Sequence, residues 1–385
     1  MILVDQKTAA RTESEWLRCL IADALVHHHP FCLWKTPGKD EKNLIISVGG
    51  VKLVKEVSLE DSDPGFLLAP FQSESDKVFF PADLLYRFEG GNLISKIPDH
   101  LTQPSESARL NFYQKAENSN KMGTDFKALV KKSIHAIDQG LFEKVVPSRF
   151  KDVPLQNEYP VLSIFEKLCH KHPHALVSLV SSPITGTWLG ASPELLVSVS
   201  QNKFKTVALA GTLPYTPDVD LKKVAWTQKE IEEQAFVCRY IINCFKKIRL
   251  RDYEEHGPKT TVAGNLMHLK TEYEVDLLNA NFPQLGSVML KLLHPTSAVC
   301  GMPLEPAQKF LLEHEGYDRE FYSGFQGPIN LKSESLLYVN LRCLQLLPGV
   351  ARCYAGAGVT ADSVPELEWN ETEMKLENLY PILVQ

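Results

Sequence analysis

Ala175-Leu-Val-Ser-Leu-Val-Ser181 is the stretch that decides the fold class, because it has the pattern of a β-strand and the chain soon repeats it. Two runs of the same kind follow, Leu195-Leu-Val-Ser-Val-Ser200 and Phe204-Lys-Thr-Val-Ala-Leu209. These runs are rich in β-branched residues or alternate apolar with polar side chains. Short turns separate them, which favours antiparallel pairing over the longer crossovers that parallel strands need.

Helical patterns lie on both sides of these strands. Apolar residues recur at helical spacing from Phe126 to Gln139, and a longer helix is expected from Val224 to Leu250. Further helices are expected at 13–26, 282–293, 306–315 and 366–377, and further strands at 43–50, 144–149, 336–346 and 350–356. We therefore predict an α+β fold with large antiparallel sheets and helices packed on the outside.

The polar stretch 98–125 contains few aliphatic residues and is the best candidate for a boundary in the chain. It divides the sequence into an N-terminal part, 1–115, and a core, 116–385.

The bulk composition argues against several classes of protein. A hydrophobic content of 44% is ample for a buried core, and a net charge of −6 provides no basic field for a nucleic acid partner. The eight cysteines are scattered and form no C-x-x-C pair, which is typical of a reduced, cytoplasmic protein. No signal-peptide pattern opens the chain and no uncharged run is long enough to cross a bilayer, so we expect no membrane association.

Two acidic stretches carry carboxylates at helical spacing. Glu230 and Glu233 are three residues apart, as are Glu368 and Glu371. Residues three apart project from nearly the same face of a helix, so two facing pairs would form an all-oxygen site suited to Mg²⁺. The alternative is that both pairs are ordinary solvated faces of exposed helices.

With these residues in view, the chain resembles the chorismate-utilising enzymes, which include isochorismate, salicylate, anthranilate and aminodeoxychorismate synthases. The resemblance covers about residues 120 to 385, and its strength lies in the order of many short motifs. These are Lys144-Val-Val-Pro-Ser-Arg149, Gly190-Ala-Ser-Pro-Glu-Leu195, Ala208-Leu-Ala-Gly-Thr212, Glu232-Glu-Gln234, Met267-His-Leu-Lys-Thr271, Leu293-His-Pro-Thr-Ser-Ala-Val299, Tyr322-Ser-Gly324, Tyr354-Ala-Gly-Ala-Gly358 and Glu368-Trp-Asn-Glu-Thr372. The family fold has large antiparallel sheets packed face to face with helices outside, in agreement with the class predicted above. Residues 1–115 are divergent from the family, and the resemblance implies that they form the first strands of the same fold.

The resemblance implies a set of site residues. Glu233 and Glu371 fall on the main Mg²⁺ ligands, with Glu230 and Glu368 close by, and the ion would hold the ring carboxylate of chorismate. Arg342 matches the arginine that binds the enolpyruvyl carboxylate. Further substrate contacts are implied at Gly211, Thr212, His294, Tyr322, Gly356, Gly358 and Lys375. His294 has an ordinary alternative, a helix-end histidine whose imidazole is satisfied by backbone.

Lys144 and Glu194 distinguish between members of the family. The members that use water as nucleophile carry lysine at the position of Lys144, where it acts as a general base for attack at C2 of the ring, and Glu194 is expected to protonate the departing C4 hydroxyl. Ala210 stands where the aminodeoxychorismate type often has a nucleophilic lysine. The resemblance therefore implies a Mg²⁺-dependent isochorismate synthase, an isomerase that feeds menaquinone or siderophore biosynthesis and acts as a monomer.

Three alternatives remain from the sequence. Salicylate synthases share the lysine and glutamate pair, and differ in eliminating pyruvate from the same intermediate. An anthranilate-type subunit would use ammonia, and an inactive relative would only bind or regulate. The chain also departs from the family pattern at Gln234, Leu213 and Cys300, which leaves details of substrate contact open.

Overall fold

The decisive strand, β10 (Leu176–Ser182), lies inside a nine-stranded antiparallel sheet. Both of its faces are buried, because Val177 and Leu179 pack under helices while Leu176 and Val180 face a second sheet. This double burial explains why the run has so few charged residues. The computed structural model describes residues 11–95, 110–115, 125–155, 160–377 and 379–383 of the chain.

The first sheet, sheet A, also contains strands from both ends of the chain. Its order is β7-β6-β2-β1-β10-β11-β19-β20-β9. The bounds of its other strands are β1 Phe31–Lys35, β2 Glu41–Ile46, β6 Leu84–Glu89, β7 Asn92–Leu93, β9 Ser148–Pro154, β11 Gly186–Ser192, β19 Cys343–Leu347 and β20 Val350–Gly356.

The second sheet, sheet B, has the order β14-β15-β13-β12-β18-β17-β4-β5-β3 and is also antiparallel throughout. Its strands are β3 Lys52–Val54, β4 Gly65–Ala69, β5 Lys77–Pro81, β12 Leu195–Ser200, β13 Lys203–Pro214, β14 Glu254–Ala263, β15 Leu266–Asp276, β17 Phe325–Ile329 and β18 Ser335–Val339. A separate two-stranded ribbon pairs β8 (Lys144–Val145) with β16 (Gly301–Met302).

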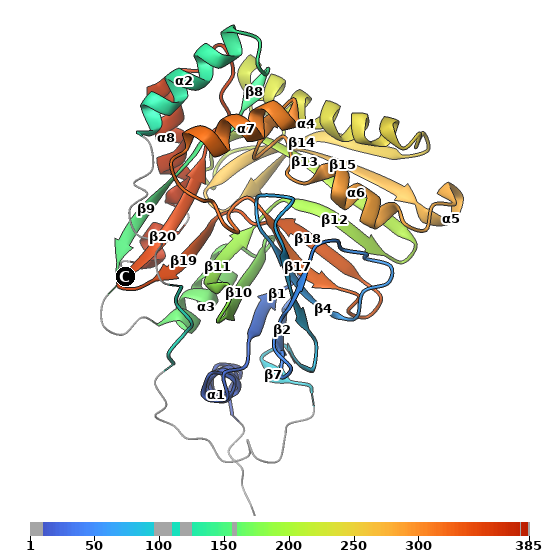
Figure 1. Cartoon of the computed structure of the whole chain (residues 1–385), viewed down its shortest axis with the longest axis vertical. Coiled ribbons are helices and arrows are strands. Elements are labelled where there is room, and N and C mark those ends of the chain that lie inside the picture. Colours follow the sequence, from blue (N-terminus) through green and yellow to red (C-terminus); the bar gives the residue numbers. More distant parts are fainter. Residues whose placement is uncertain (1–10, 96–109, 116–124, 156–159, 378, 384–385) are drawn as a thin grey trace, which may run out of the picture.

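Helices cover the outer faces of both sheets and one end of the molecule (Figure 1). Their bounds are α1 Glu13–Val26, α2 Phe126–Asp138, α3 Val161–Lys171, α4 Gln228–Lys247, α5 Leu277–Ala280, α6 Leu285–Leu293, α7 Leu304–His314, α8 Pro365–Leu376 and α9 Tyr380–Leu383. One apolar cluster lies under α1 and α3 on sheet A, and another under α4 and α6 on sheet B. A third lies between the sheets, where Trp34 and Trp188 of sheet A meet Phe66 of sheet B.

The predicted fold class is confirmed, since large antiparallel sheets pack face to face with helices outside. The prediction of one strand over 336–346 is wrong, because β18 and β19 belong to different sheets. The predicted strand 144–149 is likewise broken, between β8 and β9. The long β14–β15 hairpin is absent from the sequence prediction.

Strands from before residue 95 occur in both sheets, so the N-terminal part and the core are interleaved. Most of the predicted connecting stretch 98–125 lies outside the described residues, and the division at residues 115 and 116 stays a prediction. Within the described part of the chain, every helix is too short or too polar to span a bilayer. The eight cysteines carry free thiols.

A buried ion pair holds the segment between β8 and β9 in place. Arg319 donates to Glu315 and also to the carbonyls of Val299 (2.8 Å) and Val146 (2.7 Å). Glu315 in turn accepts hydrogen bonds from the backbone N–H (2.7 Å) and hydroxyl (2.8 Å) of Ser148. Because both side chains are almost fully buried, removal of one would leave the charge of the other buried without a partner.

We expect Arg319→Met to lower the free energy of unfolding by about 3–5 kcal/mol, since it leaves the Glu315 carboxylate buried without its counter-charge. Urea denaturation monitored by fluorescence measures this loss. Lys309→Met in α7 is the matched control, because the Lys309–Glu313 pair is exposed, and it should change stability by less than about 1 kcal/mol. Equal losses in the two variants would contradict the role of the buried pair.

Candidate active site

The candidate site lies where two paired strands pass from one sheet to the other. β11 in sheet A continues through Pro193 and Glu194 into β12 of sheet B, while β18 of sheet B continues through residues 340–342 into β19 of sheet A. Backbone hydrogen bonds join the two crossings, from Val339 N to Glu194 O (2.9 Å) and from Ala191 N to Arg342 O (3.0 Å). Glu194 and Arg342 therefore lie close to each other, at the point where the two strands cross between the sheets.

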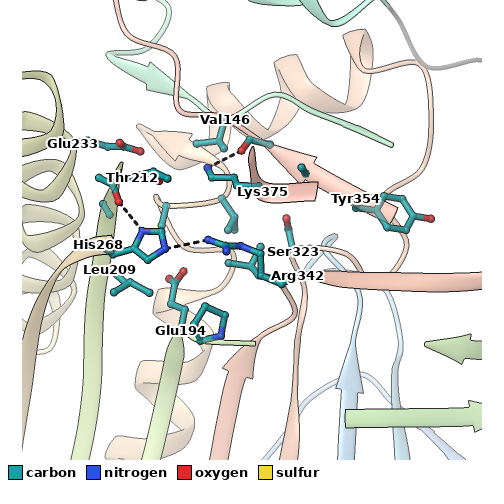
Figure 2. A pocket seen from close by; sticks show the side chains of 18 of the residues that line it. Val146, Glu194, Leu209, Thr212, Glu233, His268, Ser323, Arg342, Tyr354 and Lys375 are labelled. Carbon is teal, nitrogen blue, oxygen red and sulfur yellow. Dashed lines mark hydrogen bonds between the residues drawn. The ribbon is translucent and has the colours of Figure 1, made fainter. Parts of the chain in front are cut away.

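The crossing opens onto a pocket of about 660 Å³, which we name the central pocket. This volume includes space that is open to solvent at the mouth of the pocket. Many of the residues expected from the sequence line it, and Figure 2 shows several of their side chains around one space. These lining residues are Glu194, Gly211, Thr212, Glu233, Tyr322, Arg342, Gly356 and Lys375.

Glu194 is buried in the wall of the central pocket, with a relative exposure of 3%. The hydroxyl of Thr296 approaches its Oε1 at 3.4 Å. Burial raises the pKa of Glu194 to about 8, although the Thr296 hydrogen bond and the charges of Lys144 and Arg342 partly oppose the rise. Near neutral pH this side chain is therefore mostly a neutral carboxylic acid, which can donate a proton.

Arg342 adopts a left-handed backbone conformation (φ 48°) at its crossing, and its guanidinium donates to His268 Nε2 at 3.1 Å. Since Nε2 accepts, the proton of the neutral ring is on Nδ1, which donates to the carbonyl of Gly211 at 2.6 Å (Figure 2). Burial, and then the charge of Arg342, lowers the pKa of His268 to about 3, so the ring stays neutral. Burial also lowers the pKa of Arg342 to about 10.

A β-bulge supplies the carbonyl that orients His268. The pairing of β13 with β15 shifts register between Ala210 and Leu213, and Gly211 there has a φ of +68°. A side chain at this position would be strained and would also meet Glu230 and Trp226. His268 was not among the residues singled out in the sequence, although it lies within the motif Met267-His-Leu-Lys-Thr271.

Lys144 is completely buried beside the pocket, and its Nζ lies 3.2 Å from Glu233 Oε1. Burial opposes ionisation of Glu233, but the charges of Lys144, Lys375 and Lys229 outweigh it and hold its pKa below the ordinary value. Gly358 leaves space for this pair, because a Cβ there would lie 2.6 Å from Glu233 Oε1 and 3.1 Å from Lys144 Cε.

The other predicted carboxylates also pair with lysines or with backbone. Glu371 Oε1 accepts from Lys375 at 2.6 Å, and the same ammonium donates to the carbonyl of Gly356 at 2.8 Å. Glu368 is fully buried and accepts from Lys229 at 2.7 Å. Glu230, by contrast, forms a capping box with Thr227 at the start of α4. Among the described residues, the acidic side chains do not converge in an arrangement that would hold a metal ion.

The chemistry of these donors nevertheless fits a hard divalent cation. Burial, and then the negative charge of Glu371, raises the pKa of Glu368, so the two carboxylates repel each other. A cation beside both would relieve this repulsion, and an all-carboxylate donor set suits Mg²⁺. Glu233 and Glu371 contact the pocket directly or through Lys375, whereas Glu230 would first have to leave its capping box.

The contacts of His294 in the structure are with backbone and an aromatic ring, and its expected role near the substrate stays a prediction. Its Nε2 contacts the carbonyl of Pro70 at 3.0 Å and its ring packs edge-on against Phe325. It does not line the central pocket. These contacts agree with the ordinary alternative given for this residue, a histidine at a helix end whose imidazole is satisfied by backbone, because His294 directly follows α6.

Comparisons with known proteins bear on this geometry. The sequence model described as "Chorismate binding enzyme" matches residues 88–384. The chain belongs to the chorismate-binding enzymes. It is 28% identical over 261 residues to the isochorismate synthase EntC of Escherichia coli strain K12, and this match spans 66% of each chain, just under two thirds of the relative. It is 25% identical to the vibriobactin-specific isochorismate synthase of Vibrio cholerae, over 85% of this chain and 82% of the relative.

A solved structure, the menaquinone-specific isochorismate synthase MenF of Escherichia coli, shares the fold. Its TM-score is 0.74 at 22% identity, and the match covers 98% of this chain and 92% of MenF. The predicted family is thus confirmed. The prediction of an enzyme related to isochorismate synthases is confirmed as well, and isochorismate synthases are isomerases. The roles of the individual site residues stay predictions.

The raised pKa of Glu194 predicts a pH-dependent stability. The carboxyl is neutral in both states below about pH 4.5, and between pH 4.5 and about 8 only the unfolded chain ionises it. Its contribution therefore falls as pH rises, by roughly 1 kcal/mol per pH unit. We expect Glu194→Gln, which lacks this titration, to gain stability relative to wild type between pH 5 and pH 8 in urea denaturation. If the difference in the free energy of unfolding between the two proteins stayed constant from pH 5 to pH 8, the pKa of Glu194 would not be raised.

Proposed function

We propose that this protein is an isochorismate synthase, which adds water at C2 of chorismate and removes the hydroxyl at C4. The observation that carries the proposal is the buried carboxyl of Glu194, whose pKa of about 8 keeps it protonated in the same pocket as Arg342. The names of its relatives support the same reaction. An acid that is still protonated near neutral pH is what departure of a hydroxyl group requires.

In the proposed reaction, Arg342 binds the enolpyruvyl carboxylate through its planar guanidinium. His268 holds that guanidinium in place by accepting one of its N–H groups at 3.1 Å. Because the imidazole is neutral, it orients the arginine without repelling it as a second positive charge would. Gly211 fixes the tautomer through its carbonyl.

Lys144 is proposed to take a proton from water as the oxygen bonds to C2. The ring double bonds then shift, the C4–O bond breaks, and the leaving hydroxyl departs as water with the proton of Glu194. Lys144 can accept this proton only as the neutral amine, so in the proposed reaction its ammonium first loses a proton and its pairing with Glu233, which lies 3.2 Å away. Its complete burial shields it from bulk solvent, so the proton that it accepts comes from a water within the pocket.

Glu233 and Glu371, with Glu368 beside them, are proposed to hold Mg²⁺. When bound, the ion would neutralise the ring carboxylate of chorismate and fix the ring. Lys375 donates to both Glu371 and the carbonyl of Gly356, so it ties the carboxylate to the glycine segment that lines the pocket. A monomer in the cytoplasm remains the expected state.

The product assay tests the reaction most simply. Purified protein with chorismate and Mg²⁺ should form isochorismate, separated from chorismate by chromatography. Salicylate together with pyruvate would instead identify the alternative, a salicylate synthase. A product formed only when ammonia is supplied would contradict both.

Lys144→Ala should lower kcat by about 10²–10⁴-fold, because it removes the proposed general base. Lys131→Ala is the control, since this lysine is exposed on α2 and should retain wild-type activity. Thermal melting curves show whether each variant remains folded. Full activity of folded Lys144→Ala would exclude it as the base.

Glu371→Ala should weaken Mg²⁺ binding by about 10–100-fold, measured by isothermal titration calorimetry in the absence of substrate. Glu366→Ala is the matched control on the same helix, because this carboxylate is exposed and pairs with Lys127 at 2.6 Å. Unchanged Mg²⁺ affinity in Glu371→Ala would defeat the metal assignment.

A further inference from the structure

A second cavity, of about 1070 Å³ including space that is open to solvent, shares lining residues with the central pocket, and we name it the basic cavity. It shares Pro193, Leu209 and Arg342 with the central pocket, so Arg342 lies at the boundary between them. Its outer walls are Lys171 at the end of α3, the turn that leads from there to β10, and the end of the β14–β15 hairpin around Ala263.

The lining of the basic cavity is asymmetric in charge. Lys171, Lys270 and Arg342 line it with two histidines, and none of the described residues that line it is a carboxylate. His268 and Lys270 are two residues apart on β15 and so project from the same face of the strand. That face therefore leads from His268, in the central pocket, outward to Lys270 in the basic cavity.

Nearby carboxylates offset these charges only in part. Glu272 pairs with Lys270 at 2.5 Å, and Lys171 donates to the backbone carbonyl of Glu377 at 3.4 Å. The pKa of Glu272 is lowered, first by the Lys270 hydrogen bond and further by the charges of Lys205 and Lys259. Lys205 in turn pairs with Glu274 at 2.7 Å, and neither Glu272 nor Glu274 is among the residues that line the basic cavity.

Elsewhere in the central pocket the charges are balanced, because Glu233 pairs with Lys144 and Glu371 pairs with Lys375. The chain as a whole carries a net charge of −6, which repels an anion at long range. An anion that approaches Arg342 through the basic cavity therefore meets cationic side chains before it reaches the guanidinium.

We propose that the basic cavity is the passage by which a dicarboxylate substrate reaches the central pocket, attracted by Lys171 and Lys270 before Arg342 binds one of its carboxylates. This inference rests on the proposed function, since chorismate is the dicarboxylate concerned. The two lysines act on approach and take no part in the bond changes.

The charge of the passage is tested with the double variant Lys171→Gln/Lys270→Gln in the full-length enzyme. At an ionic strength of about 20 mM its kcat/KM for chorismate should fall about tenfold while kcat is unchanged, and the difference should shrink at about 300 mM. The control is Lys131→Gln/Lys132→Gln, which removes the same charge from the exposed face of α2 and should behave as wild type. A loss of kcat, or an unchanged kcat/KM at low ionic strength, would overturn the proposal.

The space of the passage is tested by Ala263→Trp, which fills the cavity without changing charge. It should lower kcat/KM at both ionic strengths, whereas wild-type kcat/KM in this variant would overturn the route. The two proposals fail differently. If the wild-type enzyme forms isochorismate and the variants have the same kcat/KM, only the passage is contradicted. If the wild-type enzyme neither binds nor converts chorismate, the proposed function and the passage are overturned together.

Discussion

The paired crossing of two strands between the sheets is the constraint on which the site depends. The chain passes from β11 to β12 through Glu194 and from β18 to β19 beside Arg342. Backbone hydrogen bonds join the two crossings. Two polar side chains thus enter the interior at positions that neither sheet alone could provide. The surrounding core then removes them from water, which keeps the glutamate protonated and leaves the arginine available to an anion.

The remaining groups are held by separate devices around that crossing. The buried Glu315–Arg319 pair fixes the backbone on either side of Pro147, and with it the ribbon that carries Lys144. The bulge at Gly211 orients His268, which orients Arg342. Lysines pair with the carboxylates of Glu233, Glu368 and Glu371 on α4 and α8. Each device satisfies a buried polar group, so stability of the fold and geometry of the site depend on the same contacts.

Local pattern predicted much of the fold, because strands buried on both faces and amphipathic helices leave plain signals in sequence. It failed at 336–346, where apolar residues run on although the chain changes sheet, since the left-handed turn at Arg342 is imposed by tertiary structure. Ordered motifs predicted the pocket residues, but they carry no information on which way a side chain faces. For that reason the motifs did not show that His294 contacts the carbonyl of Pro70, and His268, whose contacts depend on a bulge in a neighbouring strand, was missed.

A crystal structure of Glu194→Gln with chorismate and Mg²⁺ tests most directly whether the crossing forms the catalytic centre. We expect the enolpyruvyl carboxylate on the guanidinium of Arg342, the amide of residue 194 within hydrogen-bond distance of the C4 hydroxyl, and Nζ of Lys144 on the opposite face of the ring near C2. Chorismate bound in the central pocket with its C4 hydroxyl turned away from residue 194, or bound without contact to Arg342, would contradict this arrangement.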